Sequence, residues 1–225
     1  MTHLHYLNTT CSVCGESCRF TIPEGAVSVG SRDLDTRPAE PLRSTIYAWV
    51  KRCPSCGYAA PDPGRPLDRA ADVVKLPRYR WQLDNRKFPA IANTFLCWSI
   101  VQEDLGSPAQ AAWASLHAAW ICDDEGEDVA ARVCRKRAAD LLHRAWDQGE
   151  RLVPQDGADE ALLADLLRRA GRFREARAVV AETLEKNPQP LIADIMRLQG
   201  RLIAASDRGA HTVAEARKFR RPVAP

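Results

Sequence analysis

The spacing of apolar and polar residues changes once along the chain, near residue 90. Before that point, short β-rich or alternating segments are separated by Gly and Pro, namely RFTI (19–22), AVSV (26–29) and STIYAWV (44–50). Short runs of this kind, bounded by turn residues, are typical of strands. After that point the apolar residues recur every three or four positions, which is the period of an amphipathic helix. The pattern therefore predicts a small N-terminal β region followed by a longer helical region.

Glycine and proline divide the helical region into separate helices. Apolar residues on one face predict a first helix over 91–105 that ends at Gly106, and Ser107 and Pro108 provide a cap and a first-turn residue for the next one. A third helix is expected after the EGED turn, and three more near 158–170, 173–186 and 190–205. Short connections between such helices favour antiparallel neighbours.

The segment ALLADLLRRAGRFREARAVVAETLEKNPQP looks like a tetratricopeptide repeat. Its small residues Ala164, Gly171 and Ala176 would let two helices approach closely, and Pro188 would stop the second helix. A weaker copy of the small-residue pattern precedes it at a constant offset. We therefore expect an α+β fold, mostly α, in which antiparallel helix pairs of tetratricopeptide-like type follow the small β region.

Two CxxC motifs with a glycine directly behind them carry the clearest chemistry. They are CSVCG, with Cys11 and Cys14, and CPSCG, with Cys53 and Cys56. A CxxC turn places two sulfurs on one side of a tetrahedral site, and two such turns joined by hairpins form a zinc ribbon. We expect one structural Zn²⁺ per chain, bound by these four cysteines, in a closed site without an open position for catalysis.

Other uses of these cysteines stay open at this stage. A redox dithiol and an iron site are the alternatives to zinc. Cys18 follows the first pair closely and could compete as a ligand, although a spare thiol is the simpler interpretation. His3 and His5 could reach a metal, or could belong to a frayed N-terminus.

The distribution of motifs predicts four parts along the chain. They are a zinc ribbon over 1–60, a linker rich in Pro and charge over 61–89, a helical-repeat domain over 90–206 and a polar basic tail over 207–225.

Charge gives only a weak indication of the partner. The formal net charge is +3, and four thiolates around one Zn²⁺ would add about −2. The linker holds a basic and aromatic mixture that could stack on single-stranded nucleic acid. Its members are Arg78, Arg80, Trp81, Arg86 and Lys87. Nearby aspartates dilute this cluster, so a solvated linker is the alternative.

The sequence shows no apolar run of the roughly 20 residues that a membrane span needs. The first ten residues lack a cationic start followed by an apolar block, so we expect no signal peptide. A cytoplasmic location without membrane contact is the resulting expectation, and in a reducing compartment paired cysteines more often hold metal than form disulfides.

The chain resembles an uncharacterised bacterial family, known only as a domain of unknown function, in which a CPxCG-type zinc ribbon precedes tetratricopeptide-like helices. The residues that carry the resemblance are CSVCG, the SRDLD run with Asp33 and Asp35, IYAWVKRCPSCGYAA and LHAAWICDDEGE. The resemblance implies a cytoplasmic zinc-binding protein without an established activity. Asp33 and Asp35 would form a turn, or a polar site beside the ribbon.

These observations favour a binding protein over an enzyme. The sequence contains no Ser-His-Asp arrangement, no Gly-rich phosphate loop and no HExxH motif, so we assign no catalytic residue. The leading hypothesis is a zinc-binding adaptor or scaffold whose helical repeats bind a protein or peptide. The alternative is a nucleic-acid-binding protein that uses the ribbon and the basic linker. An enzyme that uses Asp33, Asp35 and a histidine is a third possibility.

Overall fold

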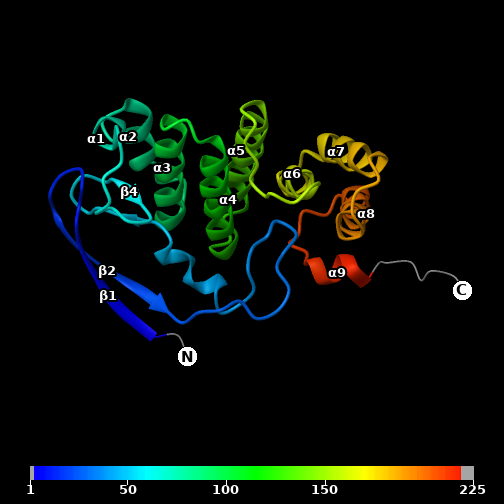
Figure 1. Cartoon of the computed structure of the whole chain (residues 1–225), viewed down its shortest axis with the longest axis horizontal. Coiled ribbons are helices and arrows are strands. Elements are labelled where there is room, and N and C mark those ends of the chain that lie inside the picture. Colours follow the sequence, from blue (N-terminus) through cyan, green and yellow to red (C-terminus); the bar gives the residue numbers. More distant parts are fainter. Residues whose placement is uncertain (1–2, 219–225) are drawn as a thin grey trace, which may run out of the picture.

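The computed structural model describes residues 3–218, in which two small antiparallel sheets precede a row of packed helices (Figure 1). The strands are β1 (His3–Thr10), β2 (Ser17–Glu24), β3 (Lys51–Arg52) and β4 (Ala59–Ala60). The helices are the 3-10 helix η1 (Arg43–Ala48) and the α-helices α1 (Ala70–Val73), α2 (Pro77–Leu83), α3 (Ala90–Asp104), α4 (Pro108–Asp124), α5 (Asp128–Asp147), α6 (Ala158–Arg169), α7 (Phe173–Glu185), α8 (Pro190–Ala204) and α9 (Val213–Lys218). The expected fold class, mostly helical with a small N-terminal β region, is confirmed.

Each sheet is a hairpin that closes around one CxxC motif. β1 and β2 pair antiparallel from His3 with Glu24 to Thr10 with Ser17, and β3 pairs with β4 through Arg52 and Ala59. The strand expected over residues 19–22 is therefore present within β2.

The strand expected over residues 44–50 is wrong, because most of this segment forms η1. The hydroxyl of Thr45 donates to the carbonyl of Leu42, and the indole of Trp49 donates to the hydroxyl of Thr45. These local bonds satisfy groups that a strand would direct to a neighbour, and they compete with the β preference of the segment. The turn also buries Thr45, Ile46 and Ala48, so tertiary packing overrides the alternating pattern.

The expected helices of the C-terminal region are present as α3 to α8. α3 packs on α4 and α4 on α5, and α6, α7 and α8 form a second group that joins α5 through α6. Gly171 connects α6 to α7 with a positive φ of 82°, a conformation that glycine adopts without a Cβ penalty. Residues on almost every side of α3 and α4 are buried. The packed helix pairs that follow the ribbon therefore share one continuous core.

The segments around this core are also folded. Residues 61–89, expected to be a linker, contain α1 and α2, and both pack on α3. Within the expected tail, α9 packs on α8, and Thr212 forms a β-bridge with Asp33. Figure 1 shows this meeting of the N-terminal loop with the C-terminal segment. The division into four parts stays a prediction.

Among the described residues, 3–218, no helix is long and apolar enough to cross a membrane.

Candidate metal centre and its surroundings

The four thiols of the two CxxC motifs converge on one point. The Sγ atoms of Cys11 and Cys56 are 3.8 Å apart, those of Cys14 and Cys53 are 3.6 Å apart, and all four lie within 4.8 Å of one another. A tetrahedron with metal–sulfur bonds of about 2.3 Å has edges of about 3.8 Å. A disulfide would need a separation of about 2.05 Å. The cysteines are therefore positioned as a tetrahedral metal site, consistent with one structural metal ion.

The backbone builds both halves of this site in the same way. Cys11 N donates to Glu16 O and Gly15 N to Cys11 O, and in the second half Cys53 N donates to Tyr58 O and Gly57 N to Cys53 O. Each glycine has a positive φ. The positive φ favours glycine at position 57, where a Cβ would also lie 2.4 Å from a methyl group of Leu83 and displace that side chain.

The surroundings of the thiols favour one of them as a thiolate. Burial alone would raise the pKa of Cys53, but the backbone N–H groups of Cys56 and Ser55 outweigh it and lower the pKa to about 7. Burial, together with the neighbouring Cys53, raises the pKa of Cys18 to about 11. Cys18 is buried, 3.9 Å from Cys53 Sγ, and donates to Glu16 O or to that sulfur. It thus lies beside the four-thiol cluster as a protonated thiol.

The second half of the site rests on α2. The hydroxyl of Tyr79 donates to Gly57 O at 2.9 Å and accepts a hydrogen bond from Ala59 N at 3.1 Å. Arg80 donates to Cys56 O at 3.3 Å. No sequence pattern indicates the role of Tyr79, because its partners are backbone atoms of a segment that is about 20 residues away in the chain. The ribbon is therefore packed against the helices on this side.

Asp35 lies away from the thiols, at a buried junction of the N-terminal loop with α4, α5 and α6. Its Oδ2 accepts hydrogen bonds from Trp120 Nε1 at 2.8 Å and Arg169 Nη1 at 2.9 Å, and Arg135 lies 3.9 Å away. Asp123 completes the cluster, which we call the Asp35 cluster, by binding both arginines. Burial raises the pKa of Asp35, as does the charge of Asp165, against the opposing effect of the arginines.

Asp33 has a separate set of partners. It is buried and accepts a hydrogen bond from Arg43 at 2.6 Å. The SRDLD run (31–35) meets the AWICDDE run (119–125) in space, because Asp35 accepts a hydrogen bond from Trp120. Arg37, two residues after the first run, forms an ion pair with Asp124. Sequence reasoning noted both runs but could not find Arg135 and Arg169, because helix spacing alone does not distinguish a buried arginine from a solvated one.

His117 is the histidine nearest to this cluster in the chain. It lies among Trp49, Phe95, Trp113 and Trp120, with ring centroids 4.7 to 5.8 Å away. Burial lowers its pKa to about 3. Among the described residues it forms no hydrogen bond with Asp33 or Asp35. The structure therefore does not bring these three side chains together as one catalytic group.

The basic residues of segment 61–89 are only partly available to a ligand. Arg78 pairs with Asp104 at 2.8 Å, and Arg80 is bound to the ribbon backbone. Arg86 and Lys87 are exposed, and 69% of Trp81 is accessible to solvent. Two cations of the tail, Arg220 and Arg221, lie outside the described residues.

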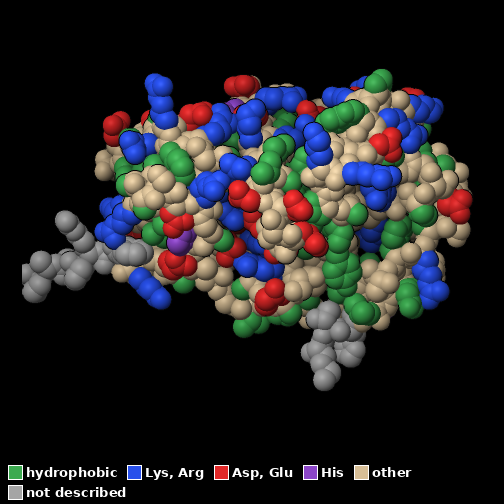
Figure 2. Space-filling view, turned by 180° about the vertical axis from the view of Figure 1, so that it is seen from behind, with side chains coloured by type: hydrophobic (Ala, Val, Ile, Leu, Met, Phe, Trp, Pro, Cys, Tyr) green, Lys and Arg blue, Asp and Glu red, His purple; other side chains and the backbone are tan. Residues whose placement is uncertain are grey.

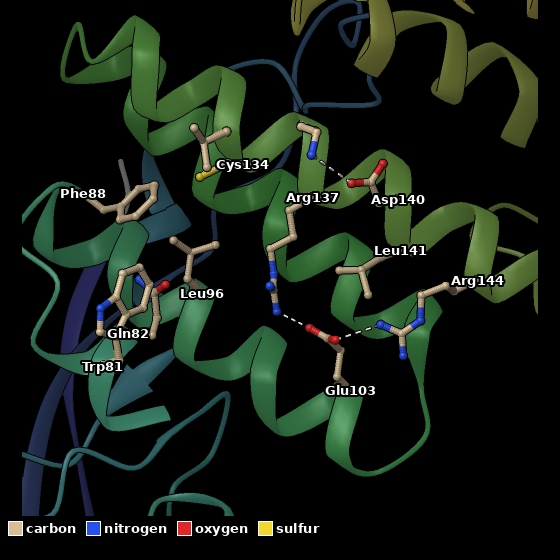
Figure 3. A pocket seen from close by; sticks show the side chains of 12 residues that line it. Trp81, Gln82, Phe88, Leu96, Glu103, Cys134, Arg137, Asp140, Leu141 and Arg144 are labelled. Carbon is tan, nitrogen blue, oxygen red and sulfur yellow. Dashed lines mark hydrogen bonds and ion pairs between the residues drawn. The ribbon is translucent and has the colours of Figure 1, made fainter. Parts of the chain in front are cut away.

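Trp81 lies at the edge of a groove of about 370 Å³ between α2, α3 and α5, which we call the tryptophan groove (Figure 3). Its apolar lining includes Phe88, Leu96 and Leu141. Polar side chains on its rim are paired: Arg137 and Arg144 both bind Glu103, and Lys136 binds Asp140.

Comparison of the chain with family models, with curated proteins and with solved structures finds no match.

Proposed function

We propose that this is a zinc-binding adaptor protein whose tryptophan groove binds a helical segment of a partner protein. Four thiols at tetrahedral spacing support zinc as the metal, because a closed set of four thiolates is the usual structural zinc site. The metal would then have a structural role in the ribbon, and binding would belong to the helical region.

The exposed face of Trp81 carries the proposal. Large aromatic side chains that remain accessible beside an apolar floor are frequent anchors of protein interfaces. Val133, 51% exposed on α5, extends the apolar surface on the far side of the groove. Both flanks are helices, so the groove has the form that accepts the apolar face of a third helix.

The net charge of the groove indicates which kind of helix it would bind. Its lining carries three cations, Lys136, Arg137 and Arg144, which share two carboxylates, Glu103 and Asp140, so a net positive charge remains. Exposed Arg86 and Lys87 lie in the same segment of chain as Trp81 and Phe88. We therefore propose an amphipathic partner helix with acidic residues beside its apolar stripe.

A selection from a phage-displayed library of random peptides, with metal-loaded full-length protein as bait, tests this proposal. We expect enriched peptides to carry apolar residues at i, i+3 or i+4 and i+7, flanked by Asp or Glu. In fluorescence anisotropy, Trp81→Ala should weaken binding of a selected peptide by about 30-fold, the loss expected for an interface anchor.

Tyr6→Ala serves as the matched control, because Tyr6 is an exposed aromatic residue on β1, 60% accessible and outside the groove. It should leave the affinity unchanged. Selected peptides that bind the Trp81→Ala variant as tightly as the original protein would overturn the proposal, as would a selection without enrichment.

A further inference from the structure

A second groove lies on the ribbon, between β2, η1, β3 and the first turn of α3. Its volume is about 400 Å³. We call it the ribbon groove; its lining consists of Arg19, Phe20, Thr21, Tyr47, Ala48, Val50, Lys51, Arg52, Ala90, Ile91 and Thr94. The lining thus contains three cations, two aromatic rings and no carboxylate.

The three cations are oriented without the help of acidic partners. The guanidinium of Arg19 stacks on the ring of Tyr6 at 3.6 Å, which leaves its N–H edge free. Lys51 Nζ donates to the carbonyls of Ala48 and Pro61, at 3.0 and 2.8 Å, so one N–H remains. Within residues 3–218, neither these two cations nor Arg52 forms an ion pair with a carboxylate.

Two other parts of the described surface differ from this groove. In the tryptophan groove the cations share Glu103 and Asp140. On the face shown in Figure 2, Lys and Arg side chains lie interspersed with Asp and Glu side chains over the helical part of the molecule. Near the ribbon groove, Asp62 acts on Lys51 only from beyond ion-pair distance. Uncompensated positive charge in a concave site attracts anions.

The aromatic rings narrow the choice of anion. Tyr47 is 40% exposed and Phe20 is half-buried, and both line the same cavity as the cations. Cations that follow a phosphate backbone, together with rings on which bases stack, are the two components of single-strand binding surfaces. We propose that the ribbon groove binds single-stranded nucleic acid, with phosphates at Arg19, Lys51 and Arg52 and a base against Tyr47 or Phe20.

A single strand fits better than a duplex because a duplex keeps its bases stacked on one another, out of reach of the two rings. The site is independent of the tryptophan groove, since the two share no lining residue. It also differs from the basic residues of segment 61–89, of which Arg78 and Arg80 are engaged within the protein.

Fluorescence anisotropy on the metal-loaded full chain provides the test. The probes are fluorescein-labelled oligouridylate and oligothymidylate of about 12 nucleotides, a length within the range of single-strand sites. We expect micromolar binding that weakens with salt. Three neutralised phosphates predict a slope of log K against log[salt] of about −2 for a single strand.

Arg19→Gln combined with Arg52→Gln should reduce the magnitude of that slope by about 1.4 and weaken binding about 25-fold at 0.1 M salt, since each lost phosphate contact contributes about 0.7. Tyr47→Ala should weaken binding about fivefold or more through lost stacking.

Arg174→Gln combined with Arg177→Gln is the matched control. It removes the same charge from exposed positions on α7 and should leave the affinity nearly unchanged. Equal metal content and equal thermal stability of the variants would show that the ribbon is intact.

Several outcomes would overturn the proposal. They are the absence of binding, equal losses in the groove variant and the α7 control, and a uridine mononucleotide that binds as tightly as the oligonucleotide. Loss of binding in Arg86→Gln with Lys87→Gln, but not in the groove variant, would place the site on segment 61–89 instead.

Discussion

The ribbon and the helical region bury their apolar side chains to very different extents. On β1, Leu4 and Tyr6 are 64% and 60% exposed, and the buried residues of the ribbon include the thiols of Cys11, Cys18 and Cys53. In α4, by contrast, buried residues surround the helix, and Trp120 and Leu116 are almost fully enclosed. A two-stranded hairpin is marginally stable at best in water. The helical region can fold by apolar burial, whereas the ribbon needs another source of stability.

The difference shows how one chain can combine two modes of stabilisation. The four thiols are positioned as a metal site, and a metal bound there would connect two hairpins that have little core of their own. The helices bury an extensive apolar core, and the loop that leaves the ribbon inserts Asp35 among them. The two regions are therefore joined by specific polar contacts as well as by packing on α2.

The largest effect is expected from removal of one metal ligand. Cys53→Ser should reduce the metal content from about one ion per chain to nearly none, because three thiolates bind far more weakly than four. Amide exchange should accelerate in β1 and β2, while α4 and α8 keep their protection. Elemental analysis and hydrogen-exchange mass spectrometry measure the two effects.

Cys18→Ala is the control for this experiment. It removes a buried thiol 3.9 Å from Cys53 but outside the four-thiol cluster. It should keep the full metal content. A Cys53→Ser protein that still carries one ion per chain, or a Cys18→Ala protein that loses it, would show that the ligand set is different.

Asp35→Asn should have the next largest effect, now on the helical region. The substitution keeps the shape of the side chain but leaves Asp123 as the carboxylate that hydrogen-bonds to both Arg135 and Arg169, while Asp165 acts on Arg169 through its charge. Breaking a buried ion pair in this way costs about 3–5 kcal/mol of unfolding free energy. Urea denaturation followed by circular dichroism measures it. Asp128→Asn, at exposed pairs with Arg132 and Arg208, should change the value by less than about 1 kcal/mol; equal effects at both positions would contradict the assignment.

Asp123 should make stability depend on pH in the acidic range. Burial alone would raise its pKa, but hydrogen bonds and charge from Arg135 and Arg169 outweigh it and lower the pKa below the ordinary 3.8. The unfolded chain therefore binds the proton first, so the stabilisation is present above pH 3.8 and is lost as pH falls through the lower, folded pKa.

Asp123→Asn should cost about 1.5–3 kcal/mol at pH 7, the range for hydrogen bonds to charged groups. The difference from the original protein should shrink as the pH falls below 3.8. Any loss of metal in acid affects both proteins and cancels in this difference. Urea midpoints at a series of pH values provide the measurement, and a difference that stays constant down to pH 3 would contradict the pKa direction of Asp123.

Sequence patterns predict motifs and helices better than they predict contacts between residues that lie far apart in the chain. The CxxC spacing and the helical period are local signals, and they located the four thiols and the helices α3 to α8. The Asp35 cluster brings residue 35 to Arg169, and no local pattern encodes that contact. The 3-10 helix at Thr45 was missed because its β-branched and aromatic residues favour a strand until packing against the helices is known.

The ribbon groove was missed for a related reason. Arg19, Lys51 and Arg52 are spread over two hairpins, so the sequence shows no basic run there. The run that it does show, around Arg78 and Arg80, is partly neutralised by Asp104 and by the ribbon backbone. Charge clusters in sequence and charge clusters on a surface need not coincide.

The smallest effect concerns packing within the second group of helices. Ala176 is fully buried on α7, whose buried side also carries Val180 and Thr183. A leucine at position 176 would need space that the packed helices do not offer, and overpacking of this kind costs about 1–3 kcal/mol. Ala178→Leu, at an exposed position two residues further along α7, adds the same side chain without that constraint and should stay within about 0.5 kcal/mol of the original protein. Thermal melts of the two variants separate the packing effect from any change in helix propensity, which is similar for both.

If the ribbon depends on metal and the helices on packing, Ala176→Leu should lower the melting temperature while the metal content stays at one ion per chain. Equal melting temperatures for both variants would show that α7 does not pack closely at this residue.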